Sequence, residues 1–385
     1  MTRFQPHETL AIVAPSFNQP SETFIRNHVR TIAPESTVLI CENAEKADEQ
    51  GLPVLGGIGN LAATDTFAGF LQRAFRWRWR KYVDARLQGQ DKKRIISFLQ
   101  AHNVVRVLAE FGPMGCRVAA ATTQLGIPLF VHFHGYDATS HLRDARWRRH
   151  YRQLFREASG IIVPSQFLAV KLIAAGCPED LISVSANGID LDCFEPSTQE
   201  AGRVLAVGRL VEKKAPHLSL QAFAQVREVL PEAHLDLVGD GPLRETCEAE
   251  IDRLEIRGNV TIHGMLSSEE VLPLFGKAAV FIQHSVTAPN GDTESFGISL
   301  VEAMASGIPV IVTRHNGFPE TVGDGETGVL VDEHDVDSMA RSMIEILTNP
   351  ERAEAMGRAG IARAANLFSS DIAAQRLRRI MDITL

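Results

Sequence analysis

The fold is decided by the stretch from 290 to 313, Asn290-Gly-Asp-Thr-Glu294-Ser-Phe-Gly297-Ile-Ser-Leu-Val-Glu302-Ala-Met-Ala-Ser-Gly307-Ile-Pro-Val-Ile-Val-Thr313. Gly297 has no Cβ, so the backbone there can come close to a ligand. Residues 298–306 are predicted to form a short helix, because glycine and proline follow them at once. The apolar run 309–313 is typical of a parallel strand that is covered on both faces. The stretch therefore predicts a loop, a helix and a buried strand of an α/β fold.

Two carboxylates flank the start of the predicted helix. Glu294 lies in the loop, and Glu302 lies eight residues later on the helix. A ligand at the helix N-terminus meets free N–H groups and the positive end of the dipole. One carboxylate can then hold hydroxyls at each end of that ligand, which is the layout of a sugar nucleotide. The alternative is that both acids are ordinary solvated side chains, and the spacing alone is weak evidence against it.

The full context, Glu-Ser-Phe-Gly-Ile-Ser-Leu-Val-Glu-Ala-Met-Ala-Ser-Gly-Ile-Pro-Val, is more specific. It resembles the Glu-x7-Glu motif of the retaining GT-B glycosyltransferases of family 4, in particular the exopolysaccharide-biosynthesis type. The resemblance implies an α/β fold of two doubly wound, Rossmann-like parallel-sheet domains that face each other across a cleft. It places an acceptor domain at 1–196, a nucleotide-sugar domain at 197–368, and a C-terminal helix at 369–385 that crosses back to the first domain.

The segment Val204-Leu-Ala-Val-Gly208-Arg209-Leu-Val-Glu-Lys213-Lys214 supplies the expected cations. Arg209 offers a planar fork for two phosphate oxygens, and Lys214 offers a compact charge. Lys213 is expected to be solvated. By resemblance, Gly208, Arg209 and Lys214 form the family's diphosphate site.

The remaining donor contacts are implied by the same resemblance. Glu294 would hold sugar hydroxyls and Glu302 the ribose diol, while Met265 would lie beside the base. The other expected donor contacts are loop residues: Gly239, Gly241, Ser295, Phe296 and Gly297. A Gly-x-Gly turn alone is weak evidence, since dinucleotide-binding folds share it. No third glycine completes Gly-x-Gly-x-x-Gly here, which counts against a dehydrogenase.

A second polar segment follows the predicted strand 128–132, at the sheet edge where such folds place chemistry. The resemblance puts His134 beside the reacting sugar, where an imidazole can donate to sugar or leaving-group oxygens. His132 is expected to point away. Acceptor contacts are predicted for Asp137 and for Ser21 and Glu22, in a loop that lacks the glycine pair of many relatives. Structural, hydrogen-bonded roles are the alternative for each.

Composition fits two soluble globular domains in 385 residues. The five scattered cysteines predict neither a zinc site nor disulfides. The N-terminus shows no signal peptide, and no apolar run is long enough to span a bilayer. The expected location is the cytoplasm.

Charge is divided unevenly, with a net +3 over residues 1–196 and −11 over the rest. Residues 73–82, Arg73-Ala-Phe-Arg-Trp-Arg-Trp-Arg-Lys-Tyr82, hold five cations and four aromatic residues. Such a run suits an anionic membrane surface, and the basic cluster 143–152 adds to it. The alternatives are a helix whose aromatics pack inward, or nucleic-acid binding, which only this run suggests.

The sequence therefore predicts a retaining hexosyltransferase that uses a UDP-sugar, with glucose the first guess. The acceptor is expected to be a saccharide, lipid-linked, at the inner membrane face, and nucleic acid is not expected as a partner. No Asp-x-Asp follows a cleft strand, so no divalent metal and no cofactor are expected. A sugar-nucleotide epimerase, a phosphorylase and a non-catalytic nucleotide-sugar sensor are the alternatives.

Overall fold

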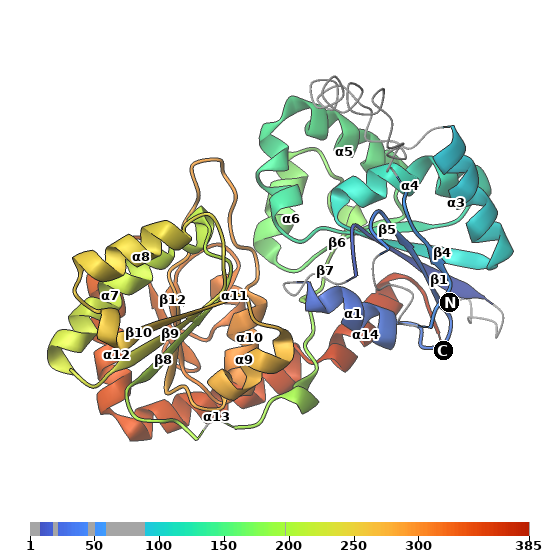
Figure 1. Cartoon of the computed structure of the whole chain (residues 1–385). Coiled ribbons are helices and arrows are strands. Elements are labelled where there is room, and N and C mark those ends of the chain that lie inside the picture. The colour runs from blue at the N-terminus through green and yellow to red at the C-terminus, as the bar shows by residue number, and fades with distance from the viewer. Residues whose placement is uncertain (1–7, 18–21, 45–50, 59–88, 197, 385) are drawn as a thin grey trace, which may run out of the picture. The chain divides into compact units, whose positions relative to one another are not determined.

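The computed structural model describes residues 8–17, 22–44, 51–58, 89–196 and 198–384. They form two compact α/β units (Figure 1). Unit 1 comprises residues 1–163, 172–183 and 377–385, and unit 2 comprises 164–171 and 184–376. Ser21 and the basic run 73–82 lie outside the described residues.

Unit 1 is built on a seven-stranded parallel sheet in the order β3-β2-β1-β4-β5-β6-β7. Its strands are β1 (Thr9–Ala14), β2 (Thr37–Cys41), β3 (Val54–Leu55), β4 (Val104–Glu110), β5 (Leu129–His132), β6 (Gly160–Val163) and β7 (Ile182–Val184). Its helices include α1 (Thr23–Thr31), α3 (Gln90–Ala101), α4 (Gly112–Leu125) and α5 (Ala145–Glu157). Helix α6 (Gln166–Ala174) begins in unit 2 and ends in unit 1. The strands β1, β2, β5 and β6 are mostly apolar and almost entirely buried, as expected for strands covered on both faces.

Unit 2 is built on a six-stranded parallel sheet in the order β10-β9-β8-β11-β12-β13. The strands are β8 (Arg203–Val207), β9 (His234–Val238), β10 (Val260–Gly264), β11 (Val280–Gln283), β12 (Val310–Thr313) and β13 (Gly328–Val331). The helices are α7 (Pro216–Val229), α8 (Arg244–Arg253), α9 (Ser268–Phe275), α10 (Ile298–Ala305), α11 (Phe318–Thr321), α12 (Val336–Thr348), α13 (Pro350–Leu367) and α14 (Ser370–Ile380). Both sheets reverse their strand order beside the first strand of the unit, which is the doubly wound arrangement.

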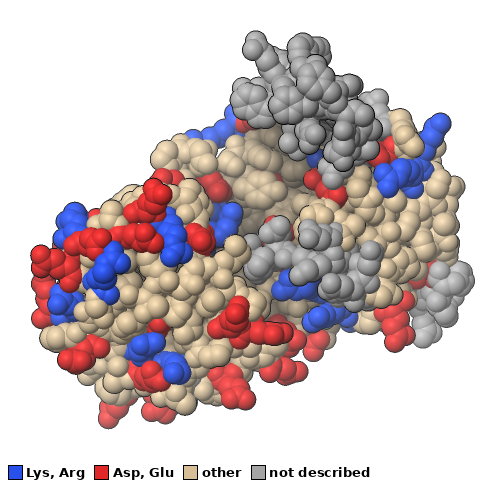
Figure 2. Space-filling model, in the orientation of Figure 1, with Lys and Arg blue, Asp and Glu red and all other residues tan. Residues whose placement is uncertain are grey.

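Two apolar cores cover the two faces of the unit 2 sheet. Val204 and Ala206 pack with α7, α8 and α12, whereas Leu205 packs with α9 and α10 on the other face. Successive strand residues thus enter opposite cores, as the period of two requires. The structure thereby confirms the α/β fold of two doubly wound parallel sheets. On the face shown in Figure 2, basic and acidic side chains are interspersed over unit 2.

The chain after Arg376 is part of unit 1. The Arg378 guanidinium donates through Nε to the carbonyl of Ile32 at 2.8 Å, and Arg106 Nε donates to the carbonyl of Met381 at 3.1 Å. Met381 is fully buried. The last residues of α14 therefore complete the packing of unit 1. Within the described residues, no helix is both long and apolar enough to cross a membrane.

Candidate active site

Three glycines lie side by side at the carboxyl ends of β8, β9 and β10. The Gly239 N–H donates to the Gly264 carbonyl at 2.8 Å, and the Gly208 N–H donates to the Val238 carbonyl at 2.9 Å. A Cβ on Gly239 would lie 2.0 Å from the Gly208 oxygen, and one on Gly241 would lie 2.5 Å from the Leu210 oxygen. The glycines thus let three backbone turns pack directly on one another, which a side chain would prevent.

Lys214 lies at the centre of the predicted donor site. It ends the short turn Glu212–Lys214 before α7, and its methylenes cover Gly208. Its ammonium contacts Glu294 Oε2 at 2.8 Å and donates to Gln283 Oε1 at 2.9 Å. An ammonium has three N–H donors, so these two acceptors leave one donor for a ligand. A small pocket beside it is lined by Gly208, Lys214 and Gln283 among other residues.

The electrostatics of this pair favour an ionised carboxylate. Burial alone would raise the pKa of Glu294, but Lys214 and Lys213 outweigh it and lower the pKa to about 2. Burial lowers the pKa of Lys214, an effect that Glu294 opposes, while the nearby charges of Lys213 and Arg209 add to the lowering. The pKa of Lys214 is therefore influenced by two cations of its own segment and by one carboxylate from a distant segment.

Lys213 is not solvated, and the expectation from the sequence was wrong. It is 7% exposed. Its ammonium contacts Asp292 Oδ1 at 3.2 Å and donates to the carbonyl of Thr293 at 3.3 Å. The adjacent lysines thus point to one loop, and Lys213 holds that loop in place next to Glu294. A helix-like pattern cannot predict this, because the two lysines lie in a tight 3₁₀ turn.

Glu302 lies on the first turns of α10 and is partly buried. Burial raises its pKa to about 7, although Lys214 acts in the opposite direction. Among the described residues, none forms a hydrogen bond or an ion pair with its carboxylate. Glu302 is thus within electrostatic range of Lys214, the cation that Glu294 contacts directly.

Arg209 follows Gly208 and is exposed. Within the described part of the chain, its guanidinium has no acidic or carbonyl partner, yet it is close enough to influence the pKa of Lys214. Met265 is 69% exposed, directly after Gly264. The structure therefore leaves Arg209, Glu302 and Met265 accessible to a ligand on unit 2.

Two residues that the sequence did not identify, His315 and Asn316, form hydrogen bonds with the backbone of Glu294. The Glu294 N–H donates to His315 Nε2 at 3.1 Å, and Asn316 donates to the Glu294 carbonyl at 3.3 Å. His315 is fully buried and its Nδ1 contacts Glu333 Oε1 at 2.5 Å. Nothing in the sequence signals that the Asn316 amide reaches back to Glu294.

The residues after Glu294 are packed inward. Ser295 is 1% exposed and Phe296 is 4% exposed. The ring of Phe296 lies edge-on to that of Phe368, with 5.5 Å between the ring centroids. Gly297 precedes α10 with φ +76°, and a Cβ there would lie 2.9 Å from both Leu300 and Phe318. The glycine is required for this turn, and only the backbone N–H groups of this segment are suited to meet a ligand.

The predicted acceptor residues of unit 1 have defined partners. Asp137 is fully buried, and its carboxylate accepts from the N–H groups of Gly112, His134 and Gly135 at 2.9 to 3.1 Å. It therefore shapes the loop after β5, and direct contact with an acceptor stays a prediction. Glu22 immediately precedes α1 and makes no side-chain cap to it.

His134 is directed into unit 1. Its Nε2 lies 2.7 Å from Glu110 Oε2, and its ring lies 4.1 Å from the rings of Phe24 and His132. The sequence predicted that His132 would point away, and this was wrong, because its ring lies beside that of His134. Residues two apart on an extended chain share a face, so the expectation misapplied the alternation of strand side chains.

Glu110, the acid that His134 contacts, is fully buried. Burial would raise its pKa, but His28 and His134 outweigh that effect and hold the pKa well below its usual range. Burial also holds the pKa of His132 well below its usual range. Neither Glu110 nor His28 was identified from the sequence, because α1 and β4 give no local sign that they meet.

Two family models match adjoining parts of the chain. The model described as Glycosyltransferase Family 4 matches residues 37–193, and the model described as Glycosyl transferases group 1 matches residues 194–363. A mannosyltransferase of Corynebacterium glutamicum, named as GDP-mannose-dependent and acting on a monoacylated phosphatidylinositol monomannoside, is 30% identical over 267 residues. That alignment covers 63% of this chain and 69% of the relative. The chain belongs to glycosyltransferase family 4.

Other family 4 proteins are similar over a shorter span. The WcaL protein of Escherichia coli, named as a glycosyltransferase of colanic acid biosynthesis, is 34% identical over 243 residues. This covers 61% of the present chain and 60% of WcaL, so the chain spans less than two thirds of that relative. Among solved structures, Alr3699/HepE of Anabaena in complex with UDP superposes with a TM-score of 0.78 at 19% identity. The superposition covers 97% of this family 4 chain and 99% of HepE, and it supports the fold.

Proposed function

We propose that this family 4 protein transfers a hexose from a nucleoside diphosphate sugar to a saccharide acceptor, with retention at the anomeric carbon. The observation that carries the proposal is the arrangement around Lys214. Its ammonium contacts Glu294 at 2.8 Å, and it is influenced by Arg209 while itself influencing Glu302. Two cations and two acids from separate segments are thus gathered on unit 2, as a sugar joined to a diphosphate and a ribose would require.

The reaction determines the part that each charge plays. Cleavage of the sugar–phosphate bond leaves negative charge on the diphosphate, and groups that bind this charge lower the barrier. Arg209 and the remaining N–H donor of Lys214 serve this purpose, together with the free N–H groups at the start of α10. Glu294, held ionised by Lys214, accepts from sugar hydroxyls, and Glu302 accepts from the ribose diol.

Retention follows from attack on the face that the diphosphate leaves. The leaving phosphate takes the proton of the acceptor hydroxyl, so no carboxylate nucleophile is required. His134 is proposed to donate to an oxygen of the reacting sugar. Its Nε2–H is engaged with the ionised Glu110, so Nδ1 can donate to that oxygen only when the imidazole is doubly protonated. Gly239, Gly241 and Met265 are proposed to border the nucleotide.

Different relatives suggest different sugar donors for this protein. HepE has been solved in complex with UDP-glucose, which supports UDP-glucose as the first candidate. The Corynebacterium relative is named as GDP-mannose-dependent, which makes GDP-mannose the second. Thermal shift with UDP-, GDP- and ADP-sugars distinguishes them, because a ligand at 100 times its Kd adds roughly 2.7 kcal/mol of stability. A shift with none of these donors would count against the proposal.

The reaction class needs its own test. A transferase incubated with UDP-glucose and no acceptor gives slow hydrolysis, whereas an epimerase gives a second UDP-sugar and a sensor gives no turnover. Donor binding is proposed to need no divalent ion, because cations already face the diphosphate. UDP-glucose affinity should then be the same with and without EDTA, as measured by calorimetry.

The acceptor is proposed to be a lipid-linked saccharide in the synthesis of a cell-surface polysaccharide. The relationship to WcaL supports a polysaccharide pathway. Peripheral binding to the inner face of an anionic membrane is proposed through residues 73–82. Around 143–152, Tyr151 is buried while Arg146 and Arg149 are exposed, so this helix offers cations on its outer face. Flotation with anionic and neutral liposomes at low salt tests the proposal, and failure to bind the anionic vesicles contradicts it.

A further inference from the structure

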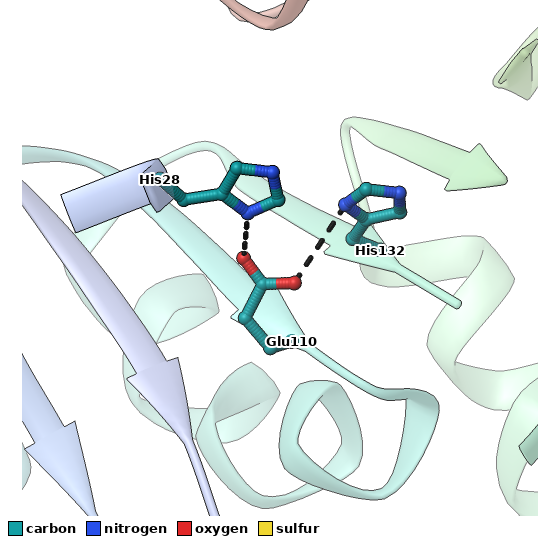
Figure 3. Close-up of side chains that lie close together, drawn as sticks. All are labelled: His28, Glu110 and His132. Carbon is teal, nitrogen blue, oxygen red and sulfur yellow. Dashed lines mark hydrogen bonds and ion pairs between the residues drawn. The ribbon is translucent and has the colours of Figure 1, made fainter. Parts of the chain in front are cut away.

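A cluster of three side chains in unit 1 has no part in the donor site described above. His28 comes from α1, Glu110 ends β4, and His132 ends β5 (Figure 3). Glu110 and His132 are direct partners in the register of β4 and β5. Their side chains are 0–3% exposed. The fold thus gathers two imidazoles and one carboxylate in a closed interior position.

The donor atoms of the cluster lie at distances that suit a shared ion. His28 Nδ1 is 2.7 Å from Glu110 Oε1, and His132 Nδ1 is 3.6 Å from Glu110 Oε2. All three ligand atoms lie within 4.8 Å of one another. Ligands at about 2.0–2.2 Å from a tetrahedral zinc ion are about 3.3–3.5 Å apart. The His132 separation of 3.6 Å is close to this value, and the His28 contact of 2.7 Å needs to open by roughly 0.6–0.8 Å.

His132 provides the independent sign that something is bound here. It is 1% exposed, and among the described residues neither of its ring nitrogens has a hydrogen-bond partner. A buried polar group without a partner costs about 1–3 kcal/mol. Its Nδ1 faces Glu110 Oε2 beyond hydrogen-bond distance (Figure 3). An ion between the two atoms would give His132 Nδ1 the partner that it lacks among the described residues.

We propose that His28, Glu110 and His132 bind a divalent transition-metal ion of the zinc type. Two imidazole nitrogens and one carboxylate suit such an ion, whereas magnesium and calcium prefer oxygen ligands alone. The ion takes the place of the proton between His28 and Glu110, so that binding releases a proton. His134, which contacts the second carboxylate oxygen at 2.7 Å, orients the ligand from outside the site.

The ion would have a structural role at the carboxyl edge of the unit 1 sheet. It joins α1 to the ends of two neighbouring strands, in addition to the β4–β5 ladder, the packing of Phe24 on Phe111 and the hydrogen bond of His28 to Glu110. This role is independent of the donor site, because unit 2 supplies all the residues around Lys214. Failure of either proposal therefore leaves the other unaffected.

The test is the metal content of the full-length protein purified without chelator. Mass spectrometry of the wild type should find close to one zinc or related ion per chain. His132→Leu should lose it, and His102→Asn, at the opposite end of β4, should keep it. A wild type without metal would overturn the proposal if it also failed to bind added Co²⁺ more tightly than His132→Leu does.

Thermal stability separates the metal site from a purely hydrogen-bonded cluster. His132 makes no hydrogen bond that leucine would remove. Without a metal site, His132→Leu should therefore be neutral or stabilising, and EDTA should not affect the wild type. With the site, EDTA lowers the wild-type Tm and leaves His132→Leu unchanged. Equal responses of the two proteins to EDTA and to added zinc would contradict the proposal.

Discussion

Lys214 shows how one residue connects several segments that are far apart in the sequence. Its ammonium contacts Glu294, which is 80 positions later, and Gln283. The sequence predicted the two acids and two bases as one site, because each lies in a recognisable motif. It did not predict Gln283, His315 or Asn316, since a supporting hydrogen bond leaves no pattern in the surrounding residues.

The cations of unit 2 are expected to act mainly in the transition state. Lys214→Ala, Arg209→Ala and Glu294→Ala should each lower kcat/KM with UDP-glucose by at least ~10²-fold, the scale of a lost transition-state contact. Lys277→Ala is the matched control, because Lys277 is an exposed lysine paired with Glu200, and surface pairs contribute little. Near-normal turnover of all three site variants would contradict the assigned roles.

Glu302 should make donor binding depend on pH. Burial raises its pKa to about 7, so the carboxylate is protonated below this pH and cannot accept from both ribose hydroxyls. UDP-glucose affinity should rise by up to about tenfold between pH 6 and pH 8, one pKa unit being a tenfold change in ionisation. Glu302→Gln should bind more weakly at pH 8, with no such rise. Calorimetry that gives parallel profiles for both proteins would refute this assignment.

The raised pKa of Glu302 affects folding stability in the opposite direction, because it favours the folded protein at low pH and not at high pH. The folded protein holds the Glu302 proton more tightly than the unfolded chain does. Its contribution is therefore full below the ordinary glutamate pKa and declines as pH rises towards 7. Glu302→Gln should unfold at a higher temperature than the wild type at pH 8, and the difference should shrink at pH 4.5.

At the scale of elements, α10 depends on the turn that precedes it. Gly297 has φ +76°, and a Cβ would lie 2.9 Å from Leu300 and Phe318. Gly325 has the same φ, with nothing within 4 Å of its Cβ position. Gly325→Ala should therefore cost only the strain of the left-handed backbone, about 1–2 kcal/mol.

Gly297→Ala adds the steric clash to that strain, so its loss of stability in urea unfolding should exceed that of Gly325→Ala. It should also weaken UDP-glucose binding, since the turn carries the start of α10. Equal losses of stability for the two variants would show that Leu300 and Phe318 can move aside without an energetic cost, and would contradict this prediction.

Most elements around the site followed from the sequence. The strands β5 and β12 and the helix α10 each differ by one residue at one end from the predicted ranges 128–132, 309–313 and 298–306. Continuous apolar runs and Gly or Pro boundaries made these strong signals. Contacts between elements did not follow, such as that of His28 with Glu110, because the register of a helix on a sheet is set by packing.

At the scale of the whole molecule, the chain returns to its first unit at the end. Arg378 donates to the carbonyl of Ile32, and the backbone of Met381 accepts from Arg106. A chain that stops after Arg376 should therefore lose thermal stability through exposure of buried unit 1 side chains. Arg378→Ala should lose less, because it removes the hydrogen bonds and keeps Met381. Unchanged unfolding of the shortened chain would show that these contacts are dispensable.

The division of the sequence into two α/β halves was implied by the family resemblance, and the length of 385 residues fits it. The structure adds that residues 164–171 belong to unit 2 and residues 377–385 to unit 1. Neither exchange can be read from composition, since both segments are too short to carry a compositional signal. Only the packing of their side chains shows which unit each segment belongs to.

The central claim is that Arg209, Lys214, Glu294 and Glu302 hold one sugar nucleotide on unit 2. A crystal structure of the protein soaked with UDP-glucose tests this most directly. The account predicts the diphosphate against Arg209 and Lys214, the ribose hydroxyls on Glu302, and the hexose hydroxyls on Glu294. A nucleotide bound elsewhere, with Lys214 still engaged only by Glu294 and Gln283, would contradict it.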